Sequence, residues 1–214
     1  MLGKISSNLG FSPTFGATLV QEKNSSYKLV EKNFSLQKFS SNWFDLSSIA
    51  KGYAVQEIHK YLILNNFNNH IIDIGGEIII NGANYDDSWT IGIQNPTSIY
   101  NDAKVIINNS NNNFLAIATS GEYRNYKSDN KGIKVTHTIN PDTLKSINNN
   151  TLSVTVVHET SATYADALAT AFNAMGSDRA IRLSNKYNIA IMLIIDDLEQ
   201  DKIIYSDKWY DLNL

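Results

Sequence analysis

Residues 163–172 (TYADALATAF) carry a carboxylate and a hydroxyl inside an otherwise apolar stretch. Asp166 and Thr170 are four residues apart, so they share one face if the segment is a helix. Burying an unpaired carboxylate is costly or forces its protonation, so its presence here requires a reason. Two hard oxygen donors on one face suit Mg²⁺, which takes few protein ligands and completes its shell with water and phosphate. The alternative is a surface helix on which Thr170 bonds back to the backbone.

A second group of chemically active residues lies in residues 44–62 (FDLSSIAKGYAVQEIHKYL). A helix is predicted from Ser47 to about Leu64, with Ser47 or Ser48 as its N-cap. Asp45 precedes this helix and Lys51 lies in its first turn. Free backbone N–H groups and the positive dipole end favour phosphate there, and Lys51 adds a positive charge. The alternative is a capped helix start with a solvated lysine.

Three further segments have residue types that serve binding or catalysis. Residues 118–126 (ATSGEYRNY) place Thr119, Ser120 and Arg124 at a strand end, which suits an anion cradle or an ordinary turn. His137 is predicted to lie on a strand just before a proline turn in residues 135–143. Histidine is the usual acid–base residue near neutral pH, although a lone histidine is more often a packed or surface residue. The pair Gly75–Gly76 lacks dinucleotide-binding spacing and predicts a tight hairpin turn.

The elements that must position these residues are strands in hairpin-like succession and a few helices. Strands are predicted within residues 70–84, 88–96, 104–121, 151–159, 188–197 and 202–212, the last as a closing edge strand. Helices are predicted at 163–175, closed by Gly176, and at 178–187. Strands that follow one another without alternating helices favour an α+β fold with a mostly antiparallel sheet and packed helices, in a single domain over residues 1–214.

Composition excludes several classes of function. The chain has 214 residues, 18 Lys plus Arg against 21 Asp plus Glu, and no cysteine. A net charge of −3 gives no electrostatic basis for binding nucleic acid. The lack of cysteine excludes disulfides, thiolate metal sites and cysteine nucleophiles. No apolar run approaches the length of a membrane span.

Five blocks occur in a specific order: DLSSIAKGYAV, IIDIGGEI, TSGEYR, HTINPDT and SVTV followed by ADALATAFNAMG. Together they resemble the ApbE family of flavin transferases, also called FAD:protein FMN transferases, over residues 45–176. The resemblance implies that the chain binds FAD and Mg²⁺ and attaches FMN through a phosphoester to a Thr or Ser of an acceptor flavoprotein, releasing AMP. Some family members instead hydrolyse FAD to FMN and AMP.

The resemblance also implies residue roles. Asp166, Thr170 and the Ser48 backbone carbonyl match the family's metal ligands. Asp45, Lys51 and Ile139 match residues that contact FAD, and Thr119 lies in a matching cofactor block. His137 matches the proposed catalytic acid–base residue, and Asp166 is expected to be essential for catalysis as the metal ligand.

The chain departs from the family pattern at Asn140 and Gln56, where Asp is usual, and at Leu144, where Gly is usual. It is expected to lack an N-terminal region that supplies part of the FAD pocket. Bacterial members imply a periplasmic or cell-envelope location, with membrane association only through a segment outside this sequence. A non-catalytic flavin-binding relative and a plain structural domain remain as alternatives; binding of FAD with and without Mg²⁺, and release of AMP, distinguish the three.

Overall fold

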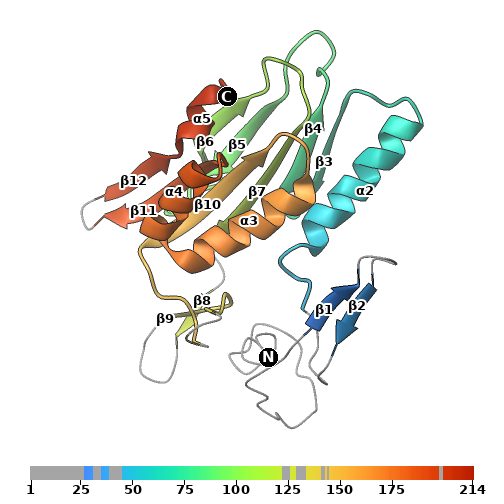
Figure 1. Ribbon diagram of the computed structural model, residues 1–214. Coiled ribbons are helices and arrows are strands. Elements are labelled where there is room, and N and C mark those ends of the chain that lie inside the picture. The colour runs from blue at the N-terminus through green and yellow to red at the C-terminus, as the bar shows by residue number, and fades with distance from the viewer. Residues whose placement is uncertain are drawn as a thin grey trace.

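The computed structural model describes residues 27–30, 35–38, 45–121, 126–128, 134–140, 143, 145–197 and 200–214 (Figure 1). The elements in chain order are β1 (Tyr27–Val30), β2 (Ser35–Lys38), α2 (Ala50–Leu64), β3 (His70–Ile74), β4 (Glu77–Asn81), β5 (Thr90–Gln94), β6 (Ala103–Asn108), β7 (Leu115–Gly121), β8 (Tyr126–Ser128), β9 (Lys134–Thr136), β10 (Thr151–His158), α3 (Ala162–Met175), α4 (Ser177–Lys186), β11 (Ala190–Asp197), β12 (Gln200–Tyr205) and α5 (Asp207–Asp211).

A six-stranded antiparallel sheet organises the described residues, in the order β12-β11-β10-β7-β4-β3. The pairs β1–β2, β5–β6 and β8–β9 form separate two-stranded sheets. The α+β prediction with a mostly antiparallel sheet is therefore confirmed.

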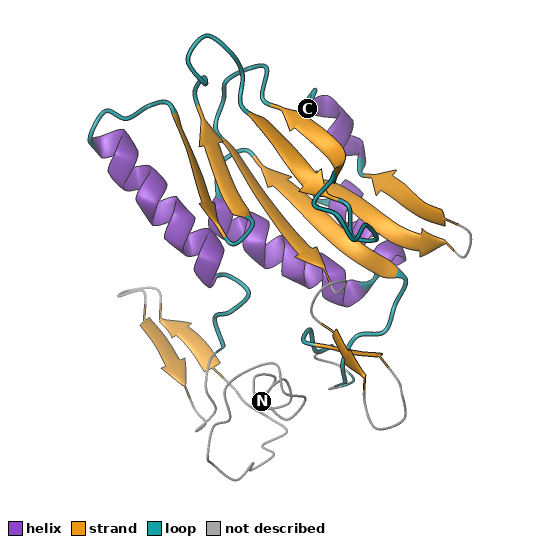
Figure 2. Cartoon of the chain, turned by 180° about the vertical axis from the view of Figure 1, so that it is seen from behind, coloured by secondary structure: helices purple, strands orange, loops and turns teal. Residues whose placement is uncertain are grey.

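The sheet is covered on both faces. On one face α2, α3 and α4 pack against the sheet through a cluster that includes Val55, Phe172 and Leu193 (Figures 1 and 2). On the other face the β5–β6 hairpin and α5 pack over a second cluster, which includes Ile107 and Trp209. Burial on both faces explains why β11 is apolar from Ala190 to Ile195 instead of alternating. β10 alternates Thr and Ser with Leu and Val, yet it is buried over almost its whole length.

The local predictions hold with two exceptions. The Gly75–Gly76 turn joins β3 to β4 with φ of 62° and 95°, the two positive values of a type I′ hairpin. Gly176 ends α3 with a φ of 79°, which glycine adopts without strain. The edge strand predicted for residues 202–212 is wrong in its second half, because the chain turns at Ser206 into α5, whose Trp209 is buried.

The other exception is the start of the first helix. Ser47 and Ser48 lie in a turn, α2 begins at Ala50, and its N-cap Ile49 makes no side-chain capping bond. The Asp45 carboxylate instead accepts the Ser47 N–H at 2.9 Å, which closes a local turn ahead of the helix. None of the described helices has both the length and the apolar character needed to cross a membrane.

Candidate functional site

The site is centred where α2 meets α3. The Gly52 N–H donates to Asp166 Oδ2 at 2.8 Å, and Asp166 is only 4% exposed. A Cβ at position 52 would lie 2.4 Å from the Ala162 carbonyl oxygen and 2.6 Å from the Asp166 Cβ. Only glycine therefore allows the two helices to approach closely enough for a backbone N–H to reach this carboxylate.

A second contact repeats this junction one helical turn further. The Gln56 Oε1 accepts the Ala162 N–H at 2.7 Å, and the Ser161 Oγ accepts the Tyr164 N–H at 3.3 Å. Both bonds satisfy N–H groups at the α3 N-terminus that have no partner within the helix. Gln56, which departs from the family's usual Asp, supplies a neutral acceptor at this place.

The bond to Asp166 also changes the backbone bonding at the start of α2. Ala50 donates to the Leu46 carbonyl and Tyr53 to the Ile49 carbonyl, each at 2.9 Å. In a regular helix the Gly52 N–H would donate to the carbonyl of Ser48. Because Gly52 donates to Asp166 instead, the Ser48 carbonyl does not receive its usual helical donor.

The available donors are those that a magnesium ion prefers. Asp166 and Thr170 lie one turn apart on α3, and the Ser48 carbonyl adds a third oxygen of a different kind. Within the described ranges no group of three or more His, Cys, Asp or Glu side chains could hold a metal. A metal at this junction would therefore depend on carbonyl, hydroxyl and phosphate oxygens in addition to one carboxylate, which suits Mg²⁺.

Lys51 and Glu77 complete the charged groups around Asp166. The Lys51 ammonium pairs with the Glu77 carboxylate and donates to the Gly75 carbonyl at 3.4 Å. Burial raises the pKa of Asp166, while the Gly52 N–H and the Lys51 charge act in the opposite direction. Burial also raises the pKa of Glu77, Lys51 opposes this, and the negative charge of Asp166 adds to the increase.

The structure also describes the remaining predicted residues, Thr119, Ile139 and His137. Thr119 on β7 faces Thr155 on β10, with their hydroxyl oxygens 2.8 Å apart. Ile139 is buried and bridges to Ser146. His137 is half-buried and follows directly after β9, so the strand predicted to carry it ends one residue earlier, at Thr136. The roles of these three residues stay predictions, as do those of Asp45, Ser48, Lys51, Asp166 and Thr170.

Two of the three departures from the family pattern are described. Asn140 closes the turn that follows Ile139, since its Oδ1 accepts the Thr143 N–H at 3.1 Å. An asparagine thus performs the turn-closing role that an aspartate can also perform. Leu144 and Arg124 lie outside the described residues.

Sequence reasoning missed Glu77 and the tertiary roles of Gly52 and Gln56. Gly52 and Gln56 are four residues apart, and so are Ala162 and Asp166. This matching spacing was a usable signal for two helices in contact. Nothing in the sequence pairs Glu77 with Lys51, since they are 26 positions apart on different elements.

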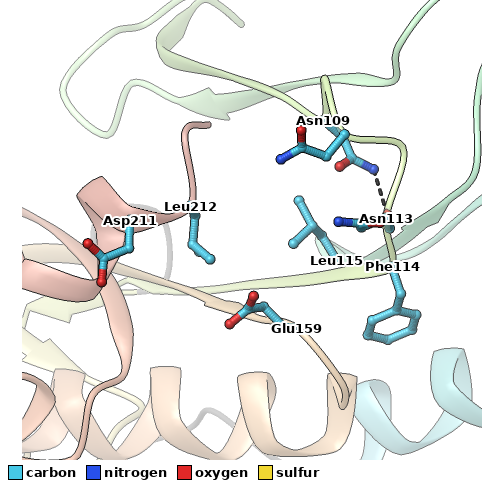
Figure 3. Close-up of a pocket in the computed structure, with 8 residues that line it drawn as sticks. Asn109, Asn113, Phe114, Leu115, Glu159, Asp211 and Leu212 are labelled. Carbon is cyan, nitrogen blue, oxygen red and sulfur yellow. Dashed lines mark hydrogen bonds between the residues drawn. The ribbon is translucent and has the colours of Figure 1, made fainter.

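A separate pocket of about 360 Å³ lies between the β6–β7 loop, the segment before α3 and the end of α5 (Figure 3). Its lining includes Asn109, Asn113, Glu159 and Asp211. Glu159 is paired with Lys208 at 3.0 Å, and none of the predicted site residues lines this pocket. The pocket is therefore distinct from the Asp166 site.

Comparison with known proteins decides the family. The model of the ApbE family matches residues 17–193, which is most of the chain. The chain belongs to the ApbE family. Its resemblance to that family, predicted from the five blocks, is confirmed.

The curated relatives that this chain matches are longer than the chain. The chain is 36% identical over 167 residues to a FAD:protein FMN transferase of Vibrio cholerae, covering 78% of the chain and 48% of that protein. It is 38% identical over 154 residues to one of Haemophilus influenzae, covering 72% of the chain and 43% of that protein. The chain thus spans less than half the length of these relatives.

Solved ApbE structures share the fold. The flavin transferase ApbE from Vibrio cholerae superposes with a TM-score of 0.79 at 29% identity, covering 98% of this chain and 69% of that one. The ApbE protein from Thermotoga maritima gives a TM-score of 0.78 at 24% identity, covering 100% of this chain and 71% of that one, and supports the fold alone.

The close contact at Gly52 predicts the effect of Gly52→Ala. The added methyl group must displace the α3 backbone, so we expect the free energy of unfolding to fall by about 1–3 kcal/mol in urea titrations. The matched control is Tyr53→Ala on the exposed side of α2, where we expect a change within about 0.5 kcal/mol. Equal stability of Gly52→Ala and wild type would show that α2 and α3 do not meet this closely.

The burial of Asp166 predicts a pH-dependent effect of Asp166→Asn. The folded-state pKa of Asp166 lies above its unfolded value, so the charged carboxylate lowers stability above the folded pKa. Protonation relieves this penalty as pH falls through that pKa. Asparagine removes the charge and keeps an acceptor for the Gly52 N–H, so the metal-free variant should melt higher than wild type at neutral pH, with the difference shrinking in acid. A variant that melts lower at every pH would contradict this account of the burial.

Proposed function

We propose that this chain transfers FMN from FAD to a Thr or Ser of an acceptor flavoprotein and releases AMP, with Mg²⁺ bound at Asp166. The observation that carries the proposal is the Gly52–Asp166 bond, which fixes a buried carboxylate beside a helix entry whose Ser48 carbonyl lacks its regular donor. The names of the relatives support the reaction.

The oxygen donors at this junction fit the proposed metal. The Asp166 and Thr170 side chains and the Ser48 carbonyl would hold Mg²⁺. The bound ion would neutralise charge on the pyrophosphate oxygens as the transition state forms. Lys51 would donate to a phosphate oxygen from the first turns of α2, where the helix dipole also favours negative charge.

In the proposed step the acceptor hydroxyl oxygen bonds to the FMN phosphorus of FAD. The bond from that phosphorus to the bridging oxygen breaks, and AMP leaves with this oxygen. The hydroxyl proton passes to His137, which serves as the general base. With water in place of the acceptor hydroxyl, the same step gives free FMN and AMP.

The assignment of the base to His137 rests on its position in the HTINPDT block, and the other three histidines lie outside the five blocks. His59 and His70 bond to each other at 2.9 Å, and His70 also bonds to the Phe67 carbonyl. His158 accepts the backbone N–H groups of Thr160 and Ser161 at the approach to α3. These contacts hold the rings of the three histidines in place, and His137 is the histidine that lies within a family block.

The proposal is tested by supplying FAD, Mg²⁺ and an acceptor flavoprotein domain, and measuring AMP and protein-bound flavin. We expect Asp166→Ala to abolish the Mg²⁺-dependent release of AMP with the fold intact. Thr170→Val should lose less, because water can replace a neutral ligand. AMP with free FMN would identify hydrolysis instead of transfer. Wild-type rates in Asp166→Ala would refute the metal assignment.

His137→Ala separates binding from catalysis. We expect turnover of FAD to fall by about 10²- to 10⁴-fold, because a positioned general base contributes on this order. The affinity for FAD with Mg²⁺ should persist, as measured by flavin fluorescence on the same preparation. A loss of turnover that matches the loss of bound FAD would make His137 a binding residue and leave the base unassigned.

A further inference from the structure

Glu77 is a buried carboxylate to which neither the sequence blocks nor the proposed reaction assigns a role. It opens β4 directly after the Gly75–Gly76 turn and is 3% exposed. Its partner is Lys51, which reaches it from α2. A buried carboxylate with one lysine partner is an expensive way to stabilise a fold, since an apolar side chain often serves as well.

We propose that Glu77 is a positioning residue that holds the Lys51 ammonium for the pyrophosphate of FAD and away from the Asp166 carboxylate. This inference rests on the proposed function.

The two contacts of the Lys51 ammonium support the first part. It forms an ion pair with the Glu77 carboxylate and donates to the Gly75 carbonyl at 3.4 Å. These two contacts restrain the ammonium, so a ligand meets a side chain that has already lost much of its rotamer freedom. An unanchored lysine would lose that freedom on binding, which weakens affinity.

The charges around Asp166 support the second part. The residue that follows Lys51, Gly52, donates its N–H to Asp166 at 2.8 Å, so the backbone of Lys51 lies beside that carboxylate. Without Glu77, the Lys51 ammonium loses the carboxylate that holds it and can turn toward Asp166. An ion pair between Lys51 and Asp166 would compete directly with a cation for that carboxylate.

Exposure determines which charge a ligand meets. The Lys51 side chain is 46% exposed and that of Glu77 is 4% exposed. An anionic ligand therefore reaches the ammonium from solvent, while the carboxylate that holds it stays buried. Repulsion between Glu77 and phosphate is further reduced because the carboxylate is paired with Lys51.

The backbone that carries Glu77 is itself fixed. The Gly76 N–H donates to Asp73 Oδ1 at 2.8 Å across the type I′ turn. The position of a Cβ on Gly75 would be 3.7 Å from the Lys51 Cδ, so the turn packs against the lysine stem. The turn thus provides both anchors of the ammonium, the Gly75 carbonyl and the Glu77 side chain.

A double-mutant cycle tests the inference, with FAD affinity in Mg²⁺ measured by flavin fluorescence and Mn²⁺ affinity measured by electron paramagnetic resonance. Glu77→Gln should weaken FAD binding about tenfold in the wild-type background and by less than about twofold in Lys51→Ala. Glu77→Asp should lose about as much as Glu77→Gln, because the shorter side chain keeps the charge but does not reach Lys51. Glu77→Gln should also weaken Mn²⁺ binding, and Lys51→Ala should reverse that loss.

Glu57→Gln is the matched control, since Glu57 pairs with the exposed Lys60 on the same helix and should change FAD affinity by less than about twofold. Thermal melts check that each variant is folded. If Glu77→Gln does not fold, Glu77→Asp replaces it in the comparison of FAD affinity with and without Lys51. The inference is overturned if Glu77→Gln weakens FAD binding equally with and without Lys51, or if Glu77→Gln tightens FAD binding. In either case the proposed function still stands if the wild-type protein binds FAD. A wild-type protein that binds no FAD overturns both.

Discussion

The contact between α2 and α3 at Gly52 is the constraint on which the rest of the site depends. It requires a residue without a Cβ, because the Ala162 carbonyl and the Asp166 Cβ occupy the space that a side chain would need. It buries a carboxylate and gives it one backbone N–H. The same N–H is thereby withdrawn from the Ser48 carbonyl, so a single close approach defines two of the oxygens proposed to hold the metal.

The arrangement of charge follows from this contact. Asp166 is buried at the helix junction, and Lys51 precedes Gly52 on the same helix, so a positive charge must lie near the carboxylate. Glu77 lies at the start of β4 in the sheet and pairs with Lys51. The three groups alternate in sign, which leaves one net negative charge in the site. A divalent cation would make the net charge positive and suited to a pyrophosphate.

Much of this fold and part of this site could be predicted from the sequence, for identifiable reasons. The period of the apolar residues gave α3 and most strands, and the Gly75–Gly76 pair gave the hairpin turn. The helical spacing of Asp166 and Thr170 placed the two on one face. The start of α2 was misassigned because Asp45 closes a turn that competes with the serine caps. The second half of the last strand was misassigned because tertiary burial of Trp209 outweighed local preference. Glu77 could not be predicted, since its pairing with Lys51 depends on how a helix packs beside a distant hairpin.

The central claim is that a divalent cation binds at the junction of α2 and α3. Crystals grown with Mn²⁺ in place of Mg²⁺ allow the ion to be located by its anomalous scattering. The account predicts an anomalous peak within coordination distance, about 2.0–2.3 Å, of an Asp166 carboxylate oxygen and of the Ser48 carbonyl oxygen. A strong peak elsewhere in the molecule, with Asp166 bound only to the Gly52 N–H, would contradict it.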